Sequence, residues 1–109
     1  MKQLCLAVAG LAAAFFVALA SAGDLALGRA KVEGICQTCH GLDGQATVAM
    51  AANLSGQQKD YMVSQLKAFR AGKRQQAQMS IVAQSLSDED IENVAEWYSS
   101  IRVTVEMPE

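Results

Sequence analysis

Residues 35–41 read ICQTCHG, a stretch that places Cys36, Cys39 and His40 within five positions of one another. Two thiols and an imidazole at this spacing can hold a zinc ion, form a redox-active disulfide or attach a haem. Each of these sites belongs to a different class of protein, so the rest of the sequence has to decide among them.

The zinc and disulfide alternatives fit the rest of the chain poorly. A structural zinc site takes four ligands, whereas this stretch offers one cysteine pair and His40, the single histidine of the chain, so that Asp43 would have to complete the set. A redox C-x-x-C motif usually opens a helix that follows a strand, and strand-like alternation is confined to the short tail 103–107. These mismatches favour the third alternative, because C-x-x-C-H is the pattern that attaches haem c.

The spacing of the motif suits covalent haem attachment. Thiols three positions apart lie about one helical turn from each other, so Cys36 and Cys39 can add to the two vinyl groups on one edge of the porphyrin. His40 then lies under the ring centre, where its imidazole can bind the iron. The large apolar ring also supplies core that a chain of this size builds with difficulty from side chains alone.

The first residues have the layout of a secretory signal peptide. Lys2 precedes the apolar run 4–19, and the small residues Ala20, Ser21 and Ala22 follow it, which predicts cleavage after Ala22. We therefore expect a signal peptide at 1–22 and one domain at 23–109, exported to the periplasm without stable membrane insertion. An uncleaved anchor is the alternative, because the run approaches the length of a membrane span. Cys5 would leave with the signal peptide.

The charge of the chain argues against nucleic acid as a partner. The formal charge of −2 becomes −3 when Lys2 is removed, and no basic tract of the kind that binds nucleic acid is present. The acidic run 88–90 is first of all a helix start, and docking to a basic partner is a secondary interpretation.

Helical periodicity predicts a small all-α domain with long loops. Asp24 is a candidate N-cap for a helix to about Ile35, and a second helix spans about 57–71 and ends before Gly72. A capping box that opens at Ser87 predicts a third helix, with apolar residues at helical spacing to Ile101. We expect loops at 41–56 and at 73–86, the latter with a helical turn near 81–83. Loops this long in so short a chain are expected to wrap something.

The order of these segments resembles the small monohaem class I cytochromes c of bacteria. In one subgroup, CxxCHG is followed by N-L-x-G-Q, by Y-x-x-x-Q-L-x-x-F-x-x-G-x-R and by L-S-D-x-D-I with aromatic residues one turn later. The matching residues here are Asn53, Leu54, Gly56 and Gln57, then Tyr61, Gln65, Leu66, Phe69, Gly72 and Arg74, and finally Leu86 to Ile91 with Trp97 and Tyr98. The resemblance covers nearly all of residues 23–109.

The resemblance implies the cytochrome c fold, with three to five short helices and long loops around one covalent haem c. It implies that the protein is an electron carrier and not an enzyme. The iron of this carrier would cycle between Fe(II) and Fe(III), and the protein would dock transiently on redox protein partners. Two alternatives stay open: a cytochrome subunit of a larger dehydrogenase, and a five-coordinate haem protein that reacts with gases or peroxide.

The second axial ligand separates these alternatives, because methionine opposite histidine gives the six-coordinate iron of an electron carrier. Residues 23–109 contain four methionines. Met62 lies on the apolar stripe of a helix, where core packing is the default, and Met107 lies near the C-terminus. Met50 follows His40 by ten residues, so the connecting loop is barely long enough to pass around the ring. Met79 lies in the segment that the resemblance assigns to the ligand, and we expect it to bind the iron.

Four other residues have both a structural and a functional interpretation. Trp97 and Tyr98 are expected to pack against the first helix and the haem edge, with an electron relay as the alternative. Lys73 and Arg74 follow the second helix, where cations suit the helix dipole, and either could hydrogen-bond a haem propionate.

Overall fold

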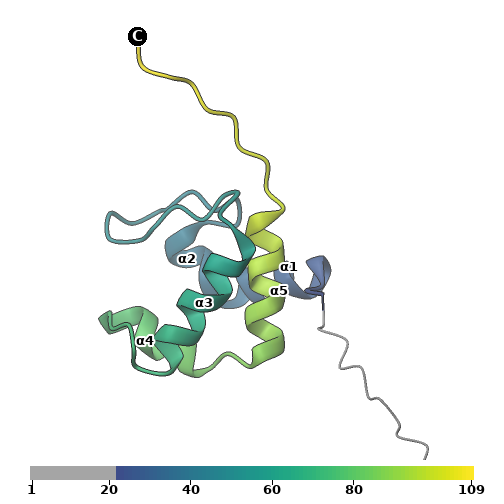
Figure 1. Ribbon diagram of the computed structural model, residues 1–109, viewed down its shortest axis with the longest axis vertical. Helices are drawn as coiled ribbons and strands as arrows, with labels where there is room; N and C mark the ends of the chain where they lie inside the picture. The colour runs from purple at the N-terminus through teal and green to yellow at the C-terminus, as the bar shows by residue number, and fades with distance from the viewer. Residues whose placement is uncertain (1–21) are drawn as a thin grey trace, which may run out of the picture.

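The computed structural model describes residues 22–109, and its regular structure is entirely helical within that range (Figure 1). The prediction of an all-α domain is confirmed. The predicted signal peptide, residues 1–22, lies outside the described residues except for Ala22. No helix within 22–109 combines the length and the apolar character needed to cross a membrane. The elements in chain order are α1 (Leu25–Lys31), η1 (Val32–Cys36), α2 (Gln37–His40), α3 (Lys59–Arg70), α4 (Ala77–Gln84) and α5 (Asp88–Ser99).

The first helical segment begins where the sequence predicts and ends later. The Asp24 side chain accepts a 2.8 Å hydrogen bond from the backbone N–H of Leu27, which makes it the N-cap. The helix continues past the predicted end at Ile35, because η1 is a π-helical turn in which the Gln37 N–H donates to the Val32 carbonyl five residues earlier. After α2 the backbone turns at Gly41, whose φ of 72° lies in the region that favours glycine.

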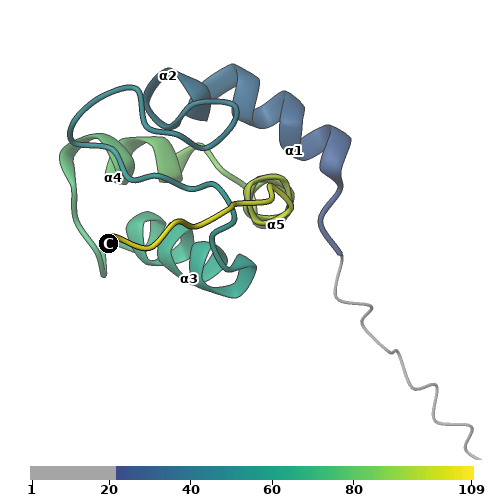
Figure 2. The ribbon, with the colours of Figure 1, turned by 90° about the horizontal axis from the view of Figure 1, so that it is seen from above.

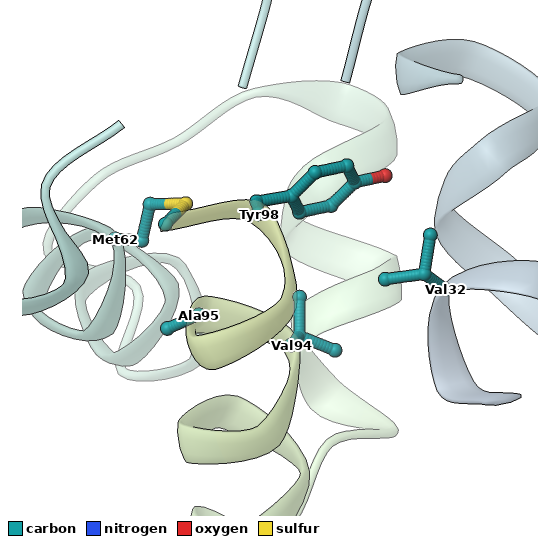
Figure 3. Close-up of a cluster of buried hydrophobic side chains, with 5 residues drawn as sticks. All are labelled: Val32, Met62, Val94, Ala95 and Tyr98. Atoms are coloured by element: carbon teal, nitrogen blue, oxygen red, sulfur yellow. The ribbon is translucent and has the colours of Figure 1, made fainter. Parts of the chain in front are cut away.

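Helix α5 is the central element of the fold. Its predicted capping box is present, since the Ser87 hydroxyl accepts from the Asp90 N–H and the Asp90 carboxylate accepts from the Ser87 N–H. Figures 1 and 2 show α5 between α1 and α3. The buried cluster in Figure 3 joins these three parts of the chain, with three side chains from α5, one from η1 and one from α3: Val94, Ala95, Tyr98, Val32 and Met62.

Helices α1 and α5 approach closely at Gly28. A Cβ atom at this position would lie 2.1 Å from the backbone oxygen of Asn93, which the backbone cannot accommodate without a shift. The Asn93 side chain, which is buried, also accepts a 2.7 Å hydrogen bond from the Asp24 N–H. The start of α1 is thereby fixed against the middle of α5.

Replacing Gly28 with alanine is expected to lower the free energy of unfolding by about 3 kcal/mol, because the added methyl group meets backbone and not a flexible side chain. Gly34→Ala is the matched control, since a Cβ atom at position 34 would have no neighbour within 4 Å. That variant should gain up to about 1 kcal/mol from better helix propensity. Guanidinium unfolding of both variants measures the difference, and equal stabilities would contradict this account of the α1 and α5 contact.

The segment 73–86 differs from the prediction. We expected a loop with a turn near 81–83, and the chain instead forms α4 over eight residues. The Gln76 side chain caps this helix by accepting hydrogen bonds from the N–H groups of Gln78 and Met79. The helix has a weak apolar period, which is why the sequence pattern missed it, but its alanine, glutamine and methionine residues are good helix formers. The predicted loop 41–56 is confirmed and contains turns only.

Candidate haem-binding site

A pocket lies between the loop 41–56, α3, α4 and the end of the first helical segment. Its lining brings together residues that are far apart in the sequence, including Cys36, Cys39 and His40 of η1 and α2 and Met79 of α4. These are the four residues that the sequence predicts as site residues, and all four line the same pocket. Most of the remaining lining is apolar: Ile35, Met50, Ala51, Leu54, Met62, Leu66, Phe69, Val82, Leu86 and Val94.

The two thiols occupy the turn that ends η1 and the helix α2. Cys36 is the last residue of η1 and Cys39 lies three positions later in α2, and both are free and partly buried. Burial raises the pKa of the Cys36 thiol to about 11, although the positive charge of Lys31 acts in the opposite direction. Redox C-x-x-C motifs use a thiolate with a lowered pKa, so the environment of Cys36 does not suit the disulfide alternative. Within 22–109, no three His, Cys, Asp or Glu side chains are grouped as a metal-binding cluster.

The imidazole of His40 is oriented by the loop that follows it. Its Nδ1 atom lies 2.7 Å from the backbone carbonyl oxygen of Ala52. A carbonyl can only accept, so Nδ1 is the donor, and in the neutral imidazole Nε2 is then the nitrogen with the lone pair that can bind a metal. The Ala52 carbonyl is a backbone group, and no side-chain pattern in the sequence could have identified it.

Helix α5 holds the segment immediately after His40. The Tyr98 hydroxyl, which is fully buried, donates a 2.8 Å hydrogen bond to the Gly41 carbonyl, and the Trp97 Nε1–H donates a 2.8 Å bond to the Leu42 carbonyl. The Gly56 N–H in turn donates to the Tyr98 carbonyl at 2.9 Å. Both ends of the loop 41–56 are therefore attached to α5. The guanidinium carbon of Arg29 on α1 lies 5.7 Å from the centre of the Trp97 ring, as expected if Trp97 packs against the first helix, and Tyr98 lines the pocket.

Tyr98→Phe is expected to lower the free energy of unfolding by about 1 kcal/mol, because it keeps the ring and removes one hydrogen bond to Gly41. The Gly41 carbonyl keeps a second, longer bond from the Gly44 N–H, which limits the loss. Tyr61→Phe is the control, since Tyr61 lines the same pocket and its side chain is 48% exposed. Chemical unfolding measures both changes, and an equal loss in Tyr61→Phe would rule out the hydrogen bond as the cause.

Met50 and Met79 both line the pocket, and they differ mainly in how exposed their side chains are. Met79 is partly buried on α4, whereas Met50 is 86% exposed on the loop 41–56, and both line the pocket. The ten residues after His40 are thus long enough to bring Met50 to the site. Met62 lines the pocket from the buried core, and Met107, on the C-terminal tail, does not line it.

Arg74 is the one Lys, Arg, Asp or Glu among the residues that line the pocket. Its guanidinium group donates a 2.7 Å hydrogen bond to the Gln65 side chain and lies 4.5 Å from the centre of the Phe69 ring. Lys73, the other candidate for a propionate contact, does not line the pocket. A pocket with one cation and no carboxylate suits a ligand that is apolar and carries acidic groups.

These residues fit a covalent haem c. The pocket offers two thiols about one turn apart, an imidazole with a free Nε2 atom, thioether sulfurs from other segments, an apolar lining and one guanidinium group. Each of these groups matches a part of the cofactor: the vinyl groups, the iron, the ring and the propionates.

The comparisons with known proteins agree with this site. The family model described as "Cytochrome C oxidase, cbb3-type, subunit III" matches residues 23–97. Cytochrome c-554(548) of Halomonas halodenitrificans is 48% identical over 82 residues, which are 72% of this chain and 98% of that protein. Cytochrome c4 of Pseudomonas aeruginosa is 34% identical over 87 residues, which are 80% of this chain and 43% of that protein.

A solved structure supports the fold. The crystal structure of reduced recombinant cytochrome c4 from Pseudomonas stutzeri superposes with a TM-score of 0.69 at 33% sequence identity. The match covers 77% of this chain and 48% of that chain, so the chain spans about half the length of this relative. The matched family region begins just before α1 and ends within α5, and it includes every residue that lines the pocket except Tyr98.

Proposed function

Because the chain belongs to the cytochrome c family, we propose that it is a periplasmic electron carrier with one covalent haem c. Proteins of this family carry covalently bound haem c, and the named relatives are cytochromes. Residues 1–109 contain one C-x-x-C-H motif and a single histidine, which supports one haem in this chain. When bound, the haem would supply one-electron redox chemistry between a donor protein and an acceptor protein.

The observation that carries this proposal is the convergence of four side chains on one pocket. Cys36 and Cys39 would hold the ring through two thioethers, and His40 would bind the iron through Nε2 while Ala52 keeps the imidazole in place. Met79 would bind the iron from the opposite side, since its partial burial suits a ligand better than the exposure of Met50. Arg74 would donate hydrogen bonds to a propionate.

Two protein ligands to the iron, His40 and Met79, would support electron transfer and leave no position for a substrate. Peroxide chemistry would call for polar groups beside the iron, such as a second histidine, and His40 is the single histidine of the chain. The side of the pocket formed by α4 is lined by Gln78, Met79 and Val82, none of which is an acid, a base or an imidazole. This lining favours the electron carrier over the five-coordinate alternative.

Absorption spectra of the purified protein test the proposal directly. The oxidised, reduced and carbon monoxide-treated reduced forms would be compared, and the reduced spectrum should not change within minutes of adding carbon monoxide, because both axial positions are filled. A rapid shift of the spectrum would establish an open coordination position and favour a gas-reactive haem protein. Purification with a stoichiometric partner would indicate the subunit of a larger dehydrogenase.

Export to the periplasm is part of the proposal and has its own test. The predicted cleavage after Ala22 would leave Gly23 as the first residue of the mature protein. Mass spectrometry of the protein from the periplasmic fraction should find this N-terminus together with the mass of one haem. A full-length chain in the membrane fraction would instead support the uncleaved anchor.

A further inference from the structure

Helix α4, which carries Met79, packs against the other helices mainly through α3. Figures 1 and 2 show α4 beside α3, on the side of the molecule away from α1. One face of α4 lines the pocket with Met79 and Val82, and the opposite face exposes Ile81 to solvent. The position of α4 in the fold therefore depends on what connects it to α3.

The last residue of α4 is hydrogen-bonded to the last residue of α3. The side-chain amide of Gln84 donates a 2.7 Å hydrogen bond to the backbone carbonyl of Arg70. Among residues 22–109, this is the one hydrogen bond that joins α4 to another helix, since its other bonds stay within 76–86. The C-terminal end of α4 is thus attached directly to Arg70.

The side chain of Arg70 also holds the segment that follows α4. The Nη1 atom donates a 2.9 Å hydrogen bond to the Leu86 carbonyl, and Nη2 donates to the carboxylate of Asp88, the first residue of α5. The Leu86 side chain is buried and lines the pocket. A guanidinium group has several N–H donors in one plane, so Arg70 can hold a carbonyl and a carboxylate at the same time.

We propose that Arg70 is a positioning residue, which keeps α4 against the pocket through Gln84 and Leu86 and so holds Met79 where it binds the iron. This inference rests on the proposed function, in which Met79 is the second axial ligand, and it identifies what keeps that ligand in place. A thioether is a soft ligand and binds ferric iron weakly. The free energy that holds α4 in position therefore contributes to how firmly Met79 stays bound.

Titration of the ferric, haem-loaded protein with imidazole tests the proposal, because imidazole competes with Met79 for the iron. The signal is the loss of the long-wavelength band of the bond between sulfur and iron. Arg70→Ala should lower the dissociation constant for imidazole by about tenfold, because it removes hydrogen bonds from a charged donor. Arg70→Lys should have a smaller effect, since an ammonium group keeps the charge but lacks the planar fork.

Gln84→Ala is a second, milder variant that leaves the Arg70 side chain intact. It removes the hydrogen bond between α4 and the Arg70 carbonyl, and it should lower the dissociation constant for imidazole by roughly threefold. If Arg70→Ala failed to fold, Gln84→Ala and Arg70→Lys would still test the proposal.

Two control variants separate positioning from general effects of charge and stability. Lys67→Ala removes the same charge from the same turn of α3 and leaves the bonds of Arg70 to Leu86 and Asp88 in place. Gly28→Ala lowers the stability of the whole domain at the contact between α1 and α5. Both variants should bind imidazole with a dissociation constant close to that of the unmodified protein.

Amide hydrogen exchange gives a readout that does not involve the iron. In Arg70→Ala the amides of α4 should exchange faster, while those of 93–98 in α5 keep their rates, because only the attachment of α4 is weakened. In Lys67→Ala the amides of both helices should keep their rates.

Three results would overturn the proposal. One is an equal imidazole constant for Arg70→Ala and Lys67→Ala, another is an equal effect of Arg70→Ala and Gly28→Ala, and the third is unchanged exchange of α4 in Arg70→Ala. If the unmodified ferric protein lacked the long-wavelength band, Met79 would not be the ligand, and this inference would fail together with the Met79 assignment. A normal band with an unchanged imidazole constant in Arg70→Ala would contradict the role of Arg70 alone.

Discussion

Replacing Cys36 and Cys39 together with alanine is expected to give a protein from which acidified acetone removes all the haem. The two thioethers are the only covalent links that the proposed site provides, and both require these thiols. The loss should also reduce stability by an amount comparable to the whole free energy of unfolding of a small domain, about 5–15 kcal/mol. Without the ring, the apolar lining of the pocket is left without its central packing partner.

The measurements for this variant are the pyridine haemochrome spectrum after extraction and the helix content by circular dichroism. Cys5→Ala is the matched control, because Cys5 lies in the predicted signal peptide and would be absent from the mature protein. Covalent haem in the Cys36→Ala/Cys39→Ala variant would show that attachment occurs elsewhere, and the proposed site would be wrong.

Met79→Ala is expected to abolish the weak long-wavelength absorption band of the ferric protein, which arises from the bond between sulfur and iron. The reduction potential should fall by on the order of 0.1 V or more, because a thioether favours ferrous iron and axial ligands set potentials over about 0.8 V. The reduced form of the variant should then bind carbon monoxide at the vacated position.

Met50→Ala is the control for this experiment, since Met50 lines the same pocket from the loop 41–56. Its band and potential should stay close to those of the unmodified protein, because its side chain is largely exposed. If Met50→Ala lost the band and Met79→Ala kept it, the assignment of the two methionines would be reversed.

The parts of the fold that the sequence predicted correctly depend on local signals. Asp24 and Ser87 are capping residues whose partners lie within three positions, and both caps form as predicted. Gly72 has a φ of 74° just after α3, as expected of a residue that ends a helix. The C-x-x-C-H motif is also local, so its three residues could be identified without knowledge of the fold.

The parts that the sequence did not predict depend on contacts between distant residues or on the backbone. The Tyr98 hydroxyl reaches a carbonyl 57 positions away, and the Ala52 carbonyl that orients His40 has no side-chain signature. The sequence periodicity did not predict helix α4, because one face of this helix lines a pocket and the opposite face exposes the apolar side chain of Ile81 to solvent. A pattern that assumes one apolar face toward a protein core does not describe such a helix.

The π-helical turn η1 determines which way the haem motif faces. A π turn holds one more residue than an α turn, and each residue of an α-helix rotates the next by about 100°. Residues after Cys36 are therefore rotated by about that angle from where an uninterrupted helix would place them. This single extra residue separates two structural requirements, because the register of α1 against α5 can be kept while Cys39 and His40 are aimed independently into the pocket. The π turn η1 thus sets the rotation of α2, which carries Cys39 and His40, relative to α1, which packs against α5.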